Sequence, residues 1–438
     1  MTRWLRQVAG LLVVLVALWG CTAGPTWPWA ADTAIQPTAT PTPTPTATPA
    51  PTATQPMDLR IWVAASLGPE ARPDAWKVLT RARDEFALRH GLTVEVRVKP
   101  DHGAGGLVDA LIWARAAAPA AAPDLILAPV EVLEDARVKA GLPGLPEPLH
   151  TTILTNDAGF AFARQAVLEH GQPFAYPVAA EAPVLAWPRP AEAELPTTWA
   201  QWAESPLPWT WAARDPWAWG AWALYTAADG QVGPTTQPQL LATDTLADML
   251  EFLVQARWNG ALRSDARLWH DMRALWSVHQ HDDIGMIVWS SSVLAQPTDW
   301  TWAPLPGPDK PGPLLMRVYA WAVTTDDPAR RQVALDWLQR VTAPGWNGPW
   351  ARAAGLWPTS SAALRQGWEP AQASAWEPWL QAARPAPPWT ARAAASQALR
   401  AAVLRVLAGT HTPLDAAYQA AVDLGAAEPR PTPTPAEP

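Results

Sequence analysis

The run of proline and threonine between Pro37 and Pro56 sets the strongest limit on what this 438-residue chain can fold into. Proline fixes φ, donates no backbone hydrogen bond and pushes the preceding residue into an extended conformation. We therefore expect this run to form an extended tether outside any core. The segment 429–438 has the same composition, and we expect it to be disordered. About 370 residues remain from Asp58 to Glu428, which is enough for two domains with separate cores.

The first residues have the pattern of a secretory signal peptide over 1–20. Two arginines precede an apolar run over 8–19, which is shorter than the ~20 residues that span a bilayer. Gly20 then precedes Cys21, the only cysteine, and this junction resembles the lipobox of bacterial lipoproteins. We therefore expect lipidation of Cys21, a tether over 21–57 and a place on the outer face of the bacterial cell membrane. An ordinary signal peptide with an incidental cysteine is the alternative.

Composition narrows the classes of partner. One cysteine forms no internal disulfide, so the fold depends on its core. The net charge is -8 and no long basic run is present, which argues against nucleic acid as a partner. The chain has 30 tryptophans but only 5 phenylalanines and 4 tyrosines. Tryptophan faces stack on sugars, but a compositional bias explains the same count, so only tryptophans near a predicted site are candidates.

Alternating strand and helix patterns begin at Asp58. Alternating or continuous apolar residues predict strands over 58–66, 93–98 and 124–129, and helical spacing predicts helices over 72–90 and 107–118. This order is the signature of a layered α/β domain. No GxGxxG or P-loop follows these strands, so the sequence contains no nucleotide-binding fingerprint.

Further elements follow along the second half. Strands are predicted over 176–187 and 284–288, and an amphipathic helix over 243–258. Two more helices are predicted to begin at Asp327-Pro328 and at Thr412-Pro413, where a capping side chain precedes a proline in the first helical position.

The order of these segments resembles the extracellular solute-binding proteins of ABC importers, the family that includes maltose-binding protein. Seven stretches in the same order carry the resemblance, and they span nearly all of 58–424: YPVAAEAPVLAWPR from Tyr176, LPTTWAQWAE from Leu195, DIGMIVWSSS from Asp283, WAPLPGPDK from Trp302, YAWAVTTDDPARRQVALDWLQRVT from Tyr319, AGLWPTSSAAL from Ala354 and VLAGTHTPLDAAYQAAV from Val406.

The resemblance implies an α/β fold of two hinge-linked lobes, each a layered βα sheet, with a ligand cleft between them. The first lobe would contain 58–182 plus 305–342, and the second 183–304 plus 345–424. It implies a monomeric, lipid-anchored binding protein that captures a small solute, most often a sugar, for the permease subunits of an ABC importer, without catalysis or a cofactor. A surface-attached enzyme acting on polysaccharide, or a binding lipoprotein without a transport role, is the alternative.

Candidate ligand-binding residues lie where predicted strands end. Ser66, Glu131 and Glu181 are suited to hydrogen bonds with ligand hydroxyls. A helix-capping serine and a solvated acid at a helix start are the alternatives for the first two. Asp215, Trp217 and Trp219 combine an acid with aromatic faces, as sugar sites do, although core packing also explains a tryptophan.

Three further groups come from the resemblance. Trp289, Ser290 and Ser291 match the ligand-facing loop of the family. Arg317, Tyr319 and Trp321 stand where the family commonly has glycines, which predicts a narrower or charged cleft. Trp357 is expected at the mouth of the cleft.

Other chemistry has weaker support. His279, His281 and the two aspartates that follow could bind a metal, but a solvated loop explains them better. No HExxH, CxxC or GxSxG motif is present. Glu192 and Glu194 allow a hydrolase with paired carboxylates, which nothing else supports.

Overall fold

A computed structural model describes residues 58–428 except 148, 156–158, 190–193, 232–240 and 296–299. The predicted signal peptide, Cys21, the tether and the C-terminal tail lie outside the described residues. Within the described part of the chain, no helix is both long enough and apolar enough to cross a membrane.

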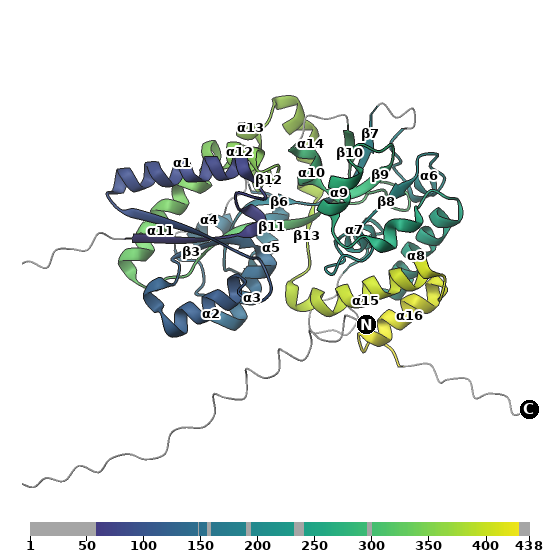
Figure 1. Cartoon of the computed structure of the whole chain (residues 1–438), viewed down its shortest axis with the longest axis horizontal. Helices are drawn as coiled ribbons and strands as arrows, with labels where there is room; N and C mark the ends of the chain where they lie inside the picture. The colour runs from purple at the N-terminus through teal and green to yellow at the C-terminus, as the bar shows by residue number, and fades with distance from the viewer. Residues whose placement is uncertain are drawn as a thin grey trace, which may run out of the picture. The chain divides into compact units, whose positions relative to one another are not determined.

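The first lobe is built on a seven-stranded sheet (Figure 1). Its strands run in the order β12-β6-β11-β3-β1-β2, and β13 pairs with β11. β1 is parallel to β2 and β3, whereas β11 is antiparallel to β3 and β6. The strands are β1 (Asp58–Ala64), β2 (Thr93–Lys99), β3 (Leu125–Pro129), β6 (Tyr176–Glu181), β11 (Leu315–Val323), β12 (Trp357–Pro358) and β13 (Arg384–Pro385).

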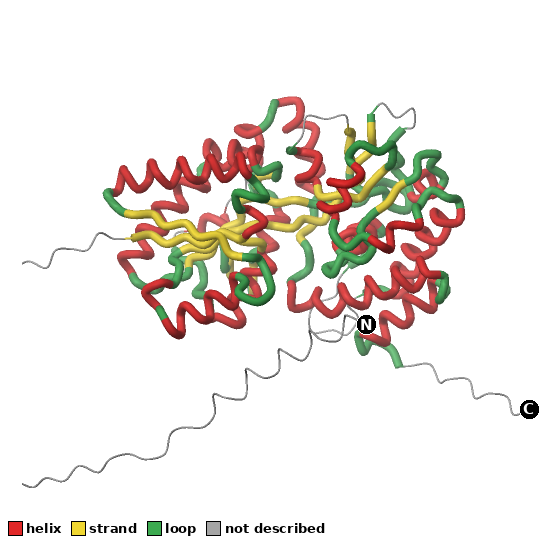
Figure 2. The backbone as a smooth tube through the Cα atoms, viewed as in Figure 1, coloured by secondary structure: helices red, strands yellow, loops and turns green. Residues whose placement is uncertain are grey.

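Helices cover both faces of this sheet, as Figure 2 shows. α1 packs beside α12 on one face, and α2 beside α3 on the other. A two-stranded ribbon of β4 (Leu168–Glu169) and β5 (Gln172–Pro173) lies in the same part of the chain. The helices are α1 (Pro73–His90), α2 (Leu107–Ala117), α3 (Val130–Ala140), α4 (Leu149–Thr155), α5 (Ala161–Ala166), α11 (Pro328–Thr342), α12 (Pro344–Ala353) and α13 (Ser361–Gly367).

The second lobe contains a four-stranded sheet in the order β10-β7-β9-β8, packed against its own helices. Its core is rich in tryptophan, and the Trp202 and Trp209 rings stack 4.2 Å apart. Its strands are β7 (Pro183–Pro188), β8 (Trp209–Thr210), β9 (Gly285–Trp289) and β10 (Trp300–Ala303). Its helices are α6 (Trp199–Ala203), α7 (Trp219–Ala227), α8 (Thr243–Trp258), α9 (Met272–His279), α10 (Ser290–Leu294), α15 (Trp389–Ala408) and α16 (Pro413–Asp423).

The chain passes between the lobes where one sheet ends and the other begins. The predicted strand over 176–187 is two strands, β6 and β7, which belong to different sheets and meet at Ala182. The segment between β10 and β11 leads back to the first sheet, and the segment after β13 leads to α15. The two lobes, each with its own sheet, are therefore joined by short connections of the chain.

The expected start of the second lobe's last segment at residue 345 is wrong. β12 pairs with β6, and α12 packs against α1, so both belong to the first lobe. α14 (Pro370–Ala382) follows, and the chain returns to the helices of the second lobe only at α15. The physical reason is that β12 adds an edge strand to the first sheet and carries α12 and α13 with it.

Candidate functional site

Glu181, the last residue of β6, lies at the junction of the lobes and is fully buried. Its carboxylate accepts hydrogen bonds from both lobes. Tyr319 Oη (2.6 Å) and Arg72 Nη2 (3.1 Å) donate from the first, and Ser291 Oγ (2.6 Å) and Arg273 Nη2 (2.9 Å) from the second. Burial would raise the pKa of Glu181, but Arg273, Arg72 and a third arginine hold that pKa well below its usual range. The carboxylate is therefore ionised and ties the lobes together.

Arg317 on β11 extends this network into the first lobe. Its Nε donates to Glu131 Oε1 at 2.7 Å, and its Nη2 lies 3.7 Å from Asp101 Oδ2. The guanidinium carbon lies 5.8 Å from the ring centroid of Trp289 on β9. Burial opposes the charge of Arg317, but Glu131 and its other acidic neighbours keep its pKa well above the ordinary value. Arg317 therefore places a paired cation between the lobes.

An aromatic group borders the network on the second lobe. Asp215 accepts from the backbone amides of Trp217 (3.0 Å) and Trp219 (2.9 Å), and so fixes the turn before α7. Burial raises the pKa of Asp215 to about 6. The Trp219 ring lies 5.2 Å from that of Trp289 and 4.1 Å from the guanidinium carbon of Arg392.

The lobes also touch at the edge of this group. The imidazole of His102, which follows β2, lies 4.5 Å from the Trp217 ring, measured between centroids. Trp389, the first residue of α15, packs on the same indole at 4.5 Å. This contact joins a loop of the first lobe to two elements of the second.

A pocket of about 960 Å³ opens between the lobes beside Arg72. α1, α12 and α13 line it from the first lobe, α10 and β10 from the second, and α14 closes a further side. Three indole rings reach it, from Trp302, Trp368 and Trp376. Arg72 connects the pocket to the network, because it donates to Glu181 and, at 2.8 Å, to the carbonyl of Ala354.

The structure brings most of the predicted residues into this region. Those that share the buried network or its aromatic border are Glu131, Glu181, Asp215, Trp217, Trp219, Trp289, Ser291, Arg317 and Tyr319. Ser66 lies beside them: its amide donates to Asp101 at 3.0 Å, and its Oγ is buried without a partner among the described residues. Ser290 instead exchanges hydrogen bonds with Ala182 and fixes the crossing between the lobes.

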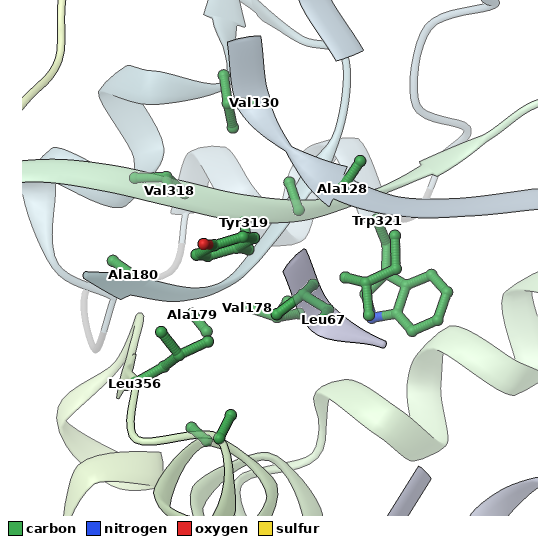
Figure 3. Close-up of a cluster of buried hydrophobic side chains, with 14 of the residues drawn as sticks. Leu67, Ala128, Val130, Val178, Ala179, Ala180, Val318, Tyr319, Trp321 and Leu356 are labelled. Atoms are coloured by element: carbon green, nitrogen blue, oxygen red, sulfur yellow. The ribbon is translucent and has the colours of Figure 1, made fainter. Parts of the chain in front are cut away.

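Two predicted residues belong to the core. Trp321 is 1% exposed and packs with Val178 and Leu67 in the first lobe (Figure 3). Trp357 is 0% exposed and lies behind the pocket, 5.4 Å from the Trp302 ring. The expectation that Trp357 lines the mouth of the cleft is therefore wrong in this structure, because other indoles cover it.

Sequence reasoning missed Arg72, Trp302, Trp368 and Trp376, which line the pocket. It also missed Arg273, which donates to Glu181. Arg72 and Arg273 resemble ordinary helix-surface arginines in the sequence. The WAPLPGPDK stretch that contributed to the resemblance begins at Trp302, and that position was the available signal.

The described residues give no support to the metal site or to the hydrolase pair considered above. Among the described residues, no group of three or more His, Cys, Asp or Glu side chains is placed to hold a metal ion. His279 Nδ1 instead lies 2.7 Å from Asp282 Oδ2. Of the two glutamates considered as a hydrolase pair, Glu192 lies outside the described residues.

Comparison with solved structures identifies the fold. The chain superimposes on the Thermus thermophilus maltotriose-binding protein bound with maltotriose with a TM-score of 0.65 at 16% identity, covering 84% of this chain and 98% of that one. A cyclo/maltodextrin-binding protein complexed with maltotetraose gives 0.65 at 17%, covering 85% and 98%. Maltose-bound T. maritima MalE3 gives 0.66 at 16%, covering 84% and 99%. No family model and no curated protein matches the chain. The fold is therefore the two-lobe α/β fold of these binding proteins.

Proposed function

We propose that this protein is a solute-binding protein that holds a sugar between its two lobes and acts without catalysis. The observation that carries the proposal is the pocket of about 960 Å³, lined from both lobes by three tryptophans and by arginine and glutamine side chains. Indole faces stack on the apolar faces of sugar rings, and the polar side chains supply hydrogen bonds to hydroxyls. The structural neighbours named above hold maltose, maltotriose or maltotetraose.

Binding between the lobes also explains how the ligand-bound protein would differ in shape from the ligand-free protein. A ligand that contacts both lobes stabilises the closed arrangement relative to the open one, because only the closed arrangement makes both sets of contacts. We propose that the closed form is the one presented to the permease subunits of an ABC importer. The solute then leaves unchanged, so the role is transport.

We propose further that the protein is attached through lipidated Cys21 to the outer face of the cell membrane, with 21–57 as a tether. The signal peptide that the sequence predicts over 1–20, directly before Cys21, supports this proposal. Growth with labelled palmitate is expected to label the full-length protein but not the Cys21→Ser variant. Equal labelling of both would contradict the anchor and would leave the binding role untouched.

Calorimetric titration with a panel of monosaccharides and malto-oligosaccharides, followed by product analysis, tests the binding role. We expect saturable binding of at least one sugar, recovered intact. Trp302→Ala should weaken binding about tenfold or more, because it removes a stacking face. Trp258→Ala, at a position 89% exposed and outside the pocket, should leave binding unchanged. Hydrolysed ligand would favour the polysaccharide-active enzyme, and no binding across the panel would overturn the proposal.

A further inference from the structure

We propose that the sugar bound in this pocket carries an anionic group, a carboxylate or a phosphate. This inference rests on the proposed function and names the class of its ligand. It comes from the charges that line the pocket, from an unpartnered guanidinium nitrogen and from the helix that begins there.

The charged side chains of the pocket are mostly cationic. Arg72 and Arg352 line it, and Asp74 is the acid among the lining residues. Asp74 lies 2.9 Å from Lys77 Nζ, and both side chains are more than 70% exposed, at 72% and 77%. The carboxylate of Asp74 is therefore paired and solvated, and it does not neutralise the arginines.

Arg72 has hydrogen-bonding capacity that the protein does not use. The residue is 6% exposed, and its Nε is buried without a hydrogen-bond partner in the described part of the chain. Its remaining nitrogens are engaged by Glu181 and the Ala354 carbonyl. Burial, followed by the charge of Arg273, lowers the pKa of Arg72, so Glu181 compensates this cation incompletely. An anion beside Arg72 would supply the missing compensation.

The N-terminus of α1 faces the same space. Residues 71–74 line the pocket, and the first helical hydrogen bond runs from the Trp76 amide to the Arg72 carbonyl at 2.9 Å. Amides earlier in the first turn have no carbonyl partner within the helix, and the helix dipole places partial positive charge there. Such an end, next to a buried arginine, favours an anion.

Arg352 completes the arrangement from α12. Its Nη1 donates to the carbonyl of Gly367 at 3.1 Å, which anchors the guanidinium at the wall of the pocket. Its other N–H groups remain able to pair with a carboxylate or phosphate in a two-point contact. With tryptophan faces for the ring and arginines for the charge, the pocket fits a uronic acid or a sugar phosphate.

Calorimetry at low salt with matched ligands tests this inference. Glucose, galactose and mannose are each compared with the corresponding uronate and 6-phosphate. We expect one acidic member to bind at least about tenfold more tightly than its neutral parent, because a charge-assisted contact is added. The advantage should shrink as salt is raised. The uronate and phosphate arms show which anion the pocket takes.

Variants locate the anion. Arg352→Gln should lower the affinity for the acidic ligand by a larger factor than the affinity for its neutral parent, and so remove most of the acidic ligand's advantage, whereas Arg352→Lys should keep part of it. Arg365→Gln is the matched control: this arginine is 64% exposed, pairs with Glu377 and does not line the pocket. Its ligand affinities should stay unchanged.

The outcomes separate the two proposals. If neutral sugars bind as tightly as acidic ones, the inference is overturned and the proposed function stands. If inorganic phosphate alone binds as tightly as a sugar phosphate, the sugar ring contributes nothing and the inference is also overturned. If no saccharide of any charge binds, the proposed function itself fails.

Discussion

Glu181 shows how much of this molecule depends on one buried carboxylate. It is 0% exposed and is the shared partner of Arg72, Arg273 and Arg317. Glu181→Gln keeps the volume but removes the charge, so the buried guanidinium of Arg72 loses its ion-pair partner and Arg273 and Arg317 each lose one acidic contact. We expect the free energy of unfolding to fall by about 3–5 kcal/mol, as when one partner of a buried ion pair is removed. Urea denaturation at pH 7 measures the change.

A surface ion pair provides the comparison. Asp84 lies 2.7 Å from Arg83 Nη2, with the aspartate side chain 67% exposed. Asp84→Asn should change the free energy of unfolding by less than about 1 kcal/mol, because water screens exposed pairs. If Glu181→Gln costs no more than Asp84→Asn, the network does not hold the lobes together.

Glu134 on α3 provides a test of pH dependence. Burial raises the pKa of Glu134 to about 7, although the Trp389 amide donates to its carboxylate at 2.7 Å. Because this pKa is raised on folding, its contribution to stability is fully present below the unfolded pKa and is lost as pH rises through about 7. Glu134→Gln should therefore be more stable than the wild type above pH 7, by on the order of 1–3 kcal/mol. Near pH 4 the two proteins should unfold at nearly the same urea concentration.

The comparison of the two pH values is its own control. Glutamine still accepts from the Trp389 amide, so a general packing defect would lower stability at both values. A difference that is the same at pH 4 and pH 8 would show that ionisation of Glu134 is not its source.

Local chemistry predicted the elements well. Asp327 accepts from the Arg330 amide at 2.8 Å and begins α11, with proline in the first position, as the sequence indicates. Gly91 ends α1 with φ 62°, a left-handed conformation that favours glycine. The strand over 176–187 was predicted as one piece because β6 and β7 are both apolar, and only the sheets show that it divides at Ala182.

α12 and α13 pack closely against each other, and this close packing depends on Gly348 in α12. A Cβ on Gly348 would lie 2.3 Å from the Ala363 carbonyl oxygen and 2.8 Å from the Gly367 amide nitrogen. Gly348→Ala must therefore push the helices apart, and we expect a loss of about 1–3 kcal/mol in the free energy of unfolding. Because Arg352 and Trp368 lie on these segments, ligand affinity should fall as well. Thermal unfolding and calorimetry measure the two effects.

Gly345, in the first turn of the same helix, is the matched control. A Cβ there meets nothing within 4 Å. Gly345→Ala should leave stability unchanged or raise it by about 0.5–1 kcal/mol, because alanine loses less backbone entropy than glycine in a helix. Equal losses from both variants would show that the close approach of the helices is not the cause.

The site as a whole was harder to predict than its parts. Glu181 and Trp289 were predicted as candidates because each stands near the end of an apolar strand pattern, close to the point where the chain was expected to cross between the lobes. Arg72 and Arg273 were missed because they reach Glu181 across 109 and 92 residues of chain, and nothing local marks such contacts. The pocket tryptophans were missed for the same reason: with 30 in the chain, composition does not tell which reach a space between lobes.

The contact of His102 with Trp217 bears on how the lobes are held together before a ligand arrives. It joins the lobes outside the pocket, at 4.5 Å between ring centroids. If it helps to hold the closed arrangement, Trp217→Ala should shift the ligand-free protein toward an open form. The apparent affinity then falls in proportion to the closed fraction, and we expect a loss of about two- to tenfold without any lost ligand contact. Small-angle scattering should show a larger radius of gyration for the ligand-free variant, and saturating sugar should restore the wild-type profile.

Trp113→Ala on α2, where the side chain is 71% exposed, is the control and should change neither the radius of gyration nor the ligand affinity. An unchanged radius together with an unchanged affinity for Trp217→Ala would mean that the Glu181 network alone sets the balance between the lobes.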